Sequence, residues 1–166
     1  GSSLAAGDVR SHVFTLQSSA KLLLLAGLLE EKGEAEVFRV VGREPSGGGF
    51  ASMSRLENEP VPSNPLINAG AIALTGLLEG TLEDRLTFLE RWSERLFGEA
   101  LPINQRVLVS ERRTGDRNRA IAYLLSEFAM RPVAAQALDA RRYPMQALLA
   151  VVVCAAVLNL GVKALG

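Results

Sequence analysis

Residues 14–25, FTLQSSAKLLLL, set a hydroxyl and an amine three positions apart at the start of a strongly helical run. On a helix this spacing places Ser18 and Lys21 on one face. Ser18 or Ser19 is a natural N-cap, where the helix dipole would stabilise a developing alkoxide. A partly desolvated Lys21 would lose its proton more readily and could act as a general base. The spacing therefore predicts an acyl-transfer dyad, with ordinary helix capping as the alternative.

The composition limits the classes of function open to the chain. Its 166 residues suffice for a single domain, 1–166, that buries most of its surface. Lys+Arg and Asp+Glu both number 18, so no global basic field attracts a nucleic acid or an anionic membrane. One cysteine, Cys154, excludes an intrachain disulfide, and one histidine, His12, leaves no cluster of zinc ligands. We expect a cytoplasmic protein without a metal or other cofactor.

The segment 145–162, MQALLAVVVCAAVLNLGV, has no charged side chain and about the minimum length for a membrane span. Gln146 and Asn159 interrupt it, many of its residues are small, and it lacks aromatic belts. We therefore expect a helix that is buried on all sides in a globular core, and no membrane span. A membrane anchor is the alternative.

Turn residues and apolar spacing predict the first elements of the chain. We expect a short strand at 12–16, a central helix at 18–32, a short element at 34–41 and a glycine-rich loop at 42–49. Gly33 is suited to end the central helix. Because apolar residues occur all round this helix, it should pack against neighbours on several sides.

The next elements follow a long irregular connection at 50–65. A helix should then begin with Asn68 as its N-cap and end near Gly80. Thr81 and Asp84 form a capping-box pattern at the start of an amphipathic helix. The predicted buried stripe of this helix is Leu82, Leu86, Leu89, Trp92 and Leu96.

The later half of the chain carries a β-prone run at 107–109 and a polar run at 110–119, followed by a core-facing helix to Phe128. Glu111 and Asn118 are seven residues apart, so they would face the same way on a continuous helix, but Gly115 lies between them. A solvated helix N-terminus is the alternative interpretation of this polar run.

Four strings occur in order that are typical of one family: FTLQSSAK at 14–21, VFRVVGREPSG at 37–47, NPLINAGAI at 64–72 and SERRTGDRNRAIAYLL at 110–125. They closely resemble the serine-dependent glutaminases, which convert L-glutamine to L-glutamate and ammonia. The resemblance spans roughly residues 5–162. It implies an α/β fold of the β-lactamase/transpeptidase type, present here mainly as its helical half with an incomplete sheet.

The resemblance also implies roles for individual residues. Ser18 matches the nucleophile of the family and Lys21 its proton-handling neighbour. Glu111 and Asn118 match residues that contact the amino-acid end of the substrate, where a carboxylate pairs with the α-ammonium group. Tyr143 matches a substrate-binding tyrosine. The implied partner is the small molecule L-glutamine, no cofactor is implied, and we expect a homo-oligomer.

The sequence departs from the family pattern at several positions. Ala51 stands where the family has an asparagine that binds the substrate, and a lost hydrogen bond of this kind costs about 1–3 kcal/mol. Pro144 restricts Tyr143 to an extended or turn conformation. Family members also begin earlier than Gly1 and continue beyond Gly166 into further strands, so the pattern indicates a chain truncated at both ends.

Two functions from different classes follow. One is an amidohydrolase that works through Ser18 and Lys21, with activity impaired by the departures. The other is a catalytically inactive helical module that associates with a partner or with itself through surfaces that further strands would cover. A penicillin-recognising enzyme shares the Ser-x-x-Lys logic, but the sequence contains neither Ser-Asp-Asn nor Lys-Thr-Gly.

Overall fold

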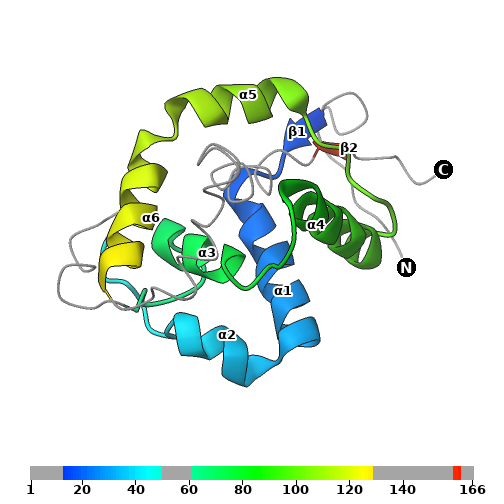
Figure 1. The fold of residues 1–166 in the computed structure, drawn as a ribbon. Coiled ribbons are helices and arrows are strands. Elements are labelled where there is room, and N and C mark those ends of the chain that lie inside the picture. The colour runs from blue at the N-terminus through cyan, green and yellow to red at the C-terminus, as the bar shows by residue number, and fades with distance from the viewer. Residues whose placement is uncertain (1–12, 50–60, 129–158, 162–166) are drawn as a thin grey trace.

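The computed structural model describes residues 13–49, 61–128 and 159–161, which are mainly helical (Figure 1). In chain order, the elements are the strand β1 (Val13–Thr15), the 3₁₀ helix η1 (Gln17–Ala20), the helices α1 (Lys21–Lys32), α2 (Glu34–Val40), α3 (Asn68–Thr75), α4 (Leu82–Phe97), α5 (Gln105–Thr114) and α6 (Asp116–Phe128), and the strand β2 (Asn159–Gly161). Figure 1 shows α1 and α3 in the middle, with the other helices around them. Ser18 and Lys21 therefore lie at the start of a central helix.

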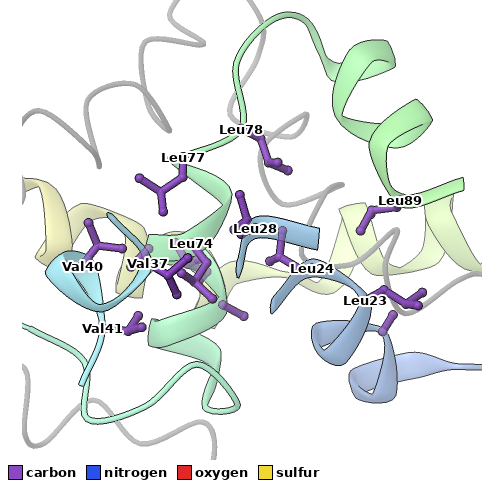
Figure 2. Close-up of a cluster of buried hydrophobic side chains, with 14 of the residues drawn as sticks. Leu23, Leu24, Leu28, Val37, Val40, Val41, Leu74, Leu77, Leu78 and Leu89 are labelled. Atoms are coloured by element: carbon purple, nitrogen blue, oxygen red, sulfur yellow. The ribbon is translucent and has the colours of Figure 1, made fainter. Parts of the chain in front are cut away.

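Helix α1 contacts α2, α3 and α4, which confirms its predicted central place. Leu24 and Leu28 are at most 2% exposed, and Figure 2 shows them with Leu74 of α3 in one cluster of buried side chains. Gly27 lets α4 approach closely, because a Cβ atom there would lie 2.7 Å from Trp92 Nε1. The start of α1 is thus anchored to the core by the remainder of the helix.

Helix α3 is short, and all of its residues from 69 to 75 are buried. It packs against α1 and against α6. Gly70 faces the loop that precedes the helix, since a Cβ atom there would overlap the Asn64 carbonyl oxygen and lie 2.8 Å from the carbonyl carbon. The Asn64 side chain closes this loop by accepting hydrogen bonds from the N–H groups of Leu66 (3.0 Å) and Ile67 (3.3 Å). The loop is therefore held against the first turn of α3.

The described sheet consists of two antiparallel strands, β1 and β2, in which Thr15 lies opposite Asn159. The sequence predicted a helix over 145–162, so strand β2 corrects that prediction. Asn159 and Gly161 are poor helix formers, and pairing with β1 satisfies backbone groups of both segments. The rest of the predicted helix lies outside the described residues. In the ranges that the structure describes, no helix has the length and the apolar character needed to cross a membrane.

Several other predicted elements are confirmed. Helix α1 ends before Gly33, α2 forms close to its predicted bounds, and residues 42–49 form neither helix nor strand. Helix α4 begins with the predicted capping box: the Thr81 N–H donates to Asp84 Oδ2 (2.6 Å), and the Asp84 N–H donates to Thr81 Oγ1 (3.3 Å). Asp84 also complements the positive end of the helix dipole.

The predicted apolar stripe of α4 is only partly buried. Leu89 and Trp92 are buried, whereas Leu96 is 52% exposed in the last turn of the helix. Phe88, which the stripe did not include, is buried beside Trp92. The buried face of α4 is therefore turned slightly from the predicted one, toward the side where Gly27 admits these two rings.

The start of α1 differs from the prediction of a serine N-cap. The α-helix is preceded by η1, its N-cap residue is Ala20, and no side chain caps it. The turn begins at Gln17, whose φ of 50° is left-handed, and the Ser19 N–H donates to the Leu16 carbonyl (3.0 Å). Because the backbone closes this turn itself, the Ser18 hydroxyl is not used as a helix cap.

Helix α3 also starts and ends differently. Asn68 is its first helical residue and Ile67 its N-cap, and the helix ends at Thr75 rather than near Gly80. No side chain caps α3, and the Ala71 N–H donates instead to the Ile67 carbonyl (3.0 Å). Consequently, the Asn68 carboxamide is available for a partner on another helix.

The later half contains two further corrections. The β-prone residues 107–109 lie in α5, because Asn104 Oδ1 caps this helix by accepting from the N–H groups of Arg106 (3.1 Å) and Val107 (3.2 Å). A good cap outweighs the modest strand preference of valine. The polar run 110–119 is a helix N-terminus only in its second part: residues 110–114 end α5, and residues 116–119 begin α6 after Gly115.

We expect Gly70→Ala to lower the free energy of unfolding by about 1–3 kcal/mol or more, because the added methyl group would overlap rigid backbone at Asn64. Gly49→Ala is the matched control, since a Cβ atom there would meet nothing within 4 Å. Urea unfolding monitored through the Trp92 fluorescence measures both. Equal midpoints for the two variants would contradict the close approach at Gly70.

Candidate active site

Ser18 lies in the 3₁₀ turn between β1 and α1 and is exposed. It lines an open pocket of ≈ 390 Å³ together with Ser19, Lys21, Leu22 and Leu66. A pocket of this size falls in the range that small-molecule ligands occupy. The predicted serine and lysine therefore share one pocket, and the serine is accessible to a ligand.

Lys21, the first residue of α1, is only 4% exposed. Its Nζ donates to the Leu66 carbonyl (2.9 Å) and to Asn68 Oδ1 (2.7 Å). Burial lowers the pKa of Lys21 from its ordinary value of 10.5, because the charged form loses water that uncharged oxygens replace only in part. A neutral amine keeps two N–H bonds, so Lys21 can still donate to both of these oxygens after it gives up a proton.

Asn68 connects Lys21 to the second half of the site. While its Oδ1 accepts from Lys21, its Nδ2 donates to Asn118 Oδ1 (3.0 Å). The sequence pattern predicts only a capping role for Asn68 and does not predict this connection between Lys21 and Asn118. One feature of the sequence does indicate such a connection. Asn68 is a polar residue in the otherwise apolar stretch PLINAGAIAL, and a polar side chain in an apolar stretch requires hydrogen-bond partners.

Asn118 reaches Asn68 because α6 packs along α3. The seven-residue spacing from Glu111 does not place both on one continuous helix, since α5 ends at Thr114 and α6 begins at Asp116. Figure 1 shows α5 and α6 running in different directions. Among the described residues, Glu111 makes no hydrogen bond to Lys21, Asn68 or Asn118.

The structure thus brings together three of the five predicted site residues. Ser18 and Lys21 line one pocket, and Asn118 is joined to Lys21 through Asn68. Glu111 is half-buried on α5. Tyr143 and the substituted position Ala51 lie outside the described residues. In the described ranges, no group of three or more histidine, cysteine, aspartate or glutamate residues could hold a metal ion.

Comparison with known proteins decides the family. A family model described as Glutaminase matches residues 1–158. The Glutaminase of Legionella pneumophila (strain Corby) is 53% identical over 115 residues, which are 69% of this chain and 37% of that protein. Glutaminase 2 of Bacillus subtilis (strain 168) is 41% identical over 131 residues, which are 76% of this chain and 42% of that protein. The chain belongs to the glutaminase family.

Solved structures of this family confirm the predicted fold class. A crystal structure of Bacillus glutaminase in the presence of 4.3 M NaCl matches with a TM-score of 0.81 at 33% identity, over 94% of this chain and 50% of that one. The Bacillus subtilis probable glutaminase matches with a TM-score of 0.79 at 32% identity. The fold is the mainly helical part of a β-lactamase-like glutaminase, and the chain spans about two fifths of the length of the curated relatives it matches.

We expect Asn68→Asp to raise the pKa of Lys21, because it places a carboxylate where Asn68 Oδ1 now lies, 2.7 Å from Nζ. The sequence has three lysines, Lys21, Lys32 and Lys163, so the Lys21 signal can be assigned in an NMR titration of the ε-carbons by its loss in Lys21→Arg. Asn104→Asp makes the same chemical change at the cap of α5. A Lys21 pKa that is unchanged by Asn68→Asp would refute this geometry.

Proposed function

We propose that this chain carries the nucleophile and the base of an L-glutamine amidohydrolase, with Ser18 as nucleophile and Lys21 as base. The observation that supports this assignment best is the buried Lys21 amine, which is held by two neutral acceptors in the same pocket as Ser18. Burial lowers the pKa of this amine, so its neutral form, which can accept a proton, is easier to reach than in water. Membership of the glutaminase family supplies the substrate.

In the first half of the proposed reaction, Ser18 Oγ attacks the side-chain carboxamide carbon of glutamine while Lys21 Nζ takes the hydroxyl proton. The tetrahedral intermediate then collapses as the C–N bond breaks. The lysine returns the proton to the departing nitrogen, so ammonia leaves and a γ-glutamyl ester remains on Ser18. In the second half, Lys21 deprotonates a water molecule that attacks this ester, which releases L-glutamate and restores Ser18.

The orientation of Asn118 supports a specific role in substrate recognition. Its Oδ1 already accepts from Asn68 Nδ2, so its own Nδ2 hydrogens are the groups it can offer to a ligand. Two N–H donors suit the α-carboxylate of an amino acid. Glu111 would then bind the α-ammonium group, and Tyr143 would contribute a further contact; both roles remain predictions from the family resemblance.

Other properties also remain predictions from the sequence. Ala51 removes a substrate contact of the family, so we expect weaker turnover than in relatives that have the asparagine. A homo-oligomeric state, a cytoplasmic location and a single domain over 1–166 are likewise inferred from the sequence. The groups that take part in the bond-making and bond-breaking steps above are Ser18, Lys21, the substrate and one water molecule.

Ser18→Ala should lower ammonia release from L-glutamine at least about 10³-fold, because the variant lacks the attacking oxygen. The neighbouring Ser19 provides the matched control, and Ser19→Ala should retain most of the activity. A second measurement is mass spectrometry after treatment with a glutamine analogue that carries a diazoketone in place of the carboxamide. Modification at Ser19 rather than Ser18, or equal ammonia release by both variants, would rule out the assigned nucleophile.

The folded protein should become more stable as the pH rises from the Lys21 pKa of the folded state to 10.5, since the unfolded chain binds this proton more tightly in that pH range.

The rate of glutamine hydrolysis should also rise with pH as Lys21 loses its proton, with an apparent pKa below 10.5, because the base acts only in its neutral form. The measurement is kcat/KM against pH, corrected with Ser18→Ala. A value of kcat/KM that does not change with pH up to 10.5 would contradict the assignment of Lys21 as the base.

A further inference from the structure

A second cavity lies at the other end of α1 from Ser18. Its volume is ≈ 340 Å³, which is in the lower part of the range that small-molecule ligands occupy. The end of α1, the segment 77–79 and the first half of α4 line it, and it shares no lining residue with the pocket of Ser18. Because Lys21 begins α1 and Glu31, a lining residue, is in its last turn, their Cα atoms are about 15 Å apart along the helix.

The inner wall of this cavity is apolar. Leu28 of α1 is fully buried, and Leu77 and Leu78 are at most 8% exposed. Figure 2 shows these three leucines among the buried side chains of the core. Phe88 of α4 adds an aromatic ring to the lining. A ligand in the cavity therefore meets mainly hydrocarbon on this side, which favours a ligand with an apolar portion.

Two ion pairs line the mouth of the cavity. Lys32 Nζ lies 2.6 Å from Glu79 Oε1, and Arg91 Nη2 lies 2.5 Å from Glu31 Oε1. These four side chains are between 36% and 83% exposed, so water screens them. Their charges cancel in pairs, and neither pair gives the cavity a net charge.

Arg85 of α4 brings a positive charge to the buried side of the cavity, where it is only 8% exposed. Burial lowers the pKa of Arg85, but a guanidinium group stays protonated in proteins. The side chain makes contacts within the protein, and its buried Nε–H donates no hydrogen bond to a described residue. Because a guanidinium has five N–H donors in a planar fork, Arg85 can bind a carboxylate in addition to its contacts within the protein.

The carboxylate of Asp84 also lines the cavity, and it is held at the start of α4. Its Oδ2 accepts from the Thr81 hydroxyl (2.7 Å) and from the Thr81 N–H (2.6 Å). These two bonds lower the pKa of Asp84, so it stays ionised in the helix cap. The Thr81 donors and the helix dipole offset this charge, which limits its repulsion of an anionic ligand.

We propose that this cavity is a second binding site, and that its ligand is a small carboxylate with an aliphatic chain. Arg85 binds the carboxylate, and the chain packs against Leu28, Leu77 and Phe88. The ligand supplies a negative charge to a guanidinium that has lost most of its water, and it removes apolar surface from water at the same time. A ligand with only the charge or only the chain satisfies one half of the site.

Trp92 provides a specific signal for occupancy of this cavity. It is the only tryptophan of the sequence, so its indole N–H gives a single resonance in a ¹⁵N NMR spectrum. Its Nε1 donates to Glu31 Oε1 at 2.7 Å, and Glu31 lines the cavity. A ligand that enters beside Glu31 should therefore shift the indole resonance.

The test is a titration of the ¹⁵N-labelled chain with three probes: hexanoate, hexan-1-ol and acetate. We expect hexanoate to shift the indole resonance saturably. Hexan-1-ol, which lacks the charge, should bind at least about tenfold more weakly. Acetate, which lacks four methylene groups of the chain, should also bind at least about tenfold more weakly.

Two variants locate the carboxylate-binding group. Arg85→Met keeps an unbranched side chain without the charge, so it should weaken hexanoate binding at least about tenfold, to the level of hexan-1-ol. Arg106→Met is the matched control, because Arg106 is exposed on α5 and does not line the cavity. This control should bind hexanoate as the wild type does.

Several results would overturn the proposal. Equal affinities for hexanoate and hexan-1-ol, or unchanged hexanoate binding by Arg85→Met, would exclude Arg85 as the carboxylate-binding group. Equal affinities for hexanoate and acetate would exclude the apolar wall as part of the site. A resonance that hexanoate does not shift saturably would exclude the site itself. If Arg85→Met does not fold, the comparison of the three probes in the wild type decides.

Discussion

Burial of the Lys21 amine is the constraint on which the remaining structure of the site depends. Lys21 is only 4% exposed, so its amine needs hydrogen-bond partners within the protein, and two uncharged oxygens accept from it. Neutral partners satisfy the amine without stabilising its charge as strongly as a carboxylate would. The lysine therefore remains bonded yet gives up its proton more readily, which is what a general base for a serine requires.

The two oxygens come from one segment, the loop and first turn of α3. Asn64 closes the loop, and Gly70 lets the helix approach it so that the Leu66 carbonyl and the Asn68 side chain both face Lys21. Packing of α3 against α1 and α6 then brings Asn118 to the other end of Asn68. The packing of α1, α3 and α6 thus sets the relative positions of Lys21, Asn68 and Asn118.

Local signals predicted the parts of this arrangement that depend on neighbouring residues. The Ser18–Lys21 spacing, the end of α1 at Gly33 and the capping box at Thr81 all follow from short-range rules, and the structure confirms the two helix ends. The role of Asn68 was missed because its partners are 47 and 50 residues away. The helical state of 107–109 and the strand at Asn159 were missed because capping and strand pairing outweighed local preference.

The most direct measurement of the central claim is the pKa of Lys21 in the folded wild-type protein, obtained from its ε-carbon chemical shift against pH. We expect a value below the ordinary 10.5, and a return to that ordinary value when the chain is unfolded in urea. A folded-state value at or above 10.5 would mean that the amine stays charged in its pocket, and Lys21 could not serve as the base for Ser18.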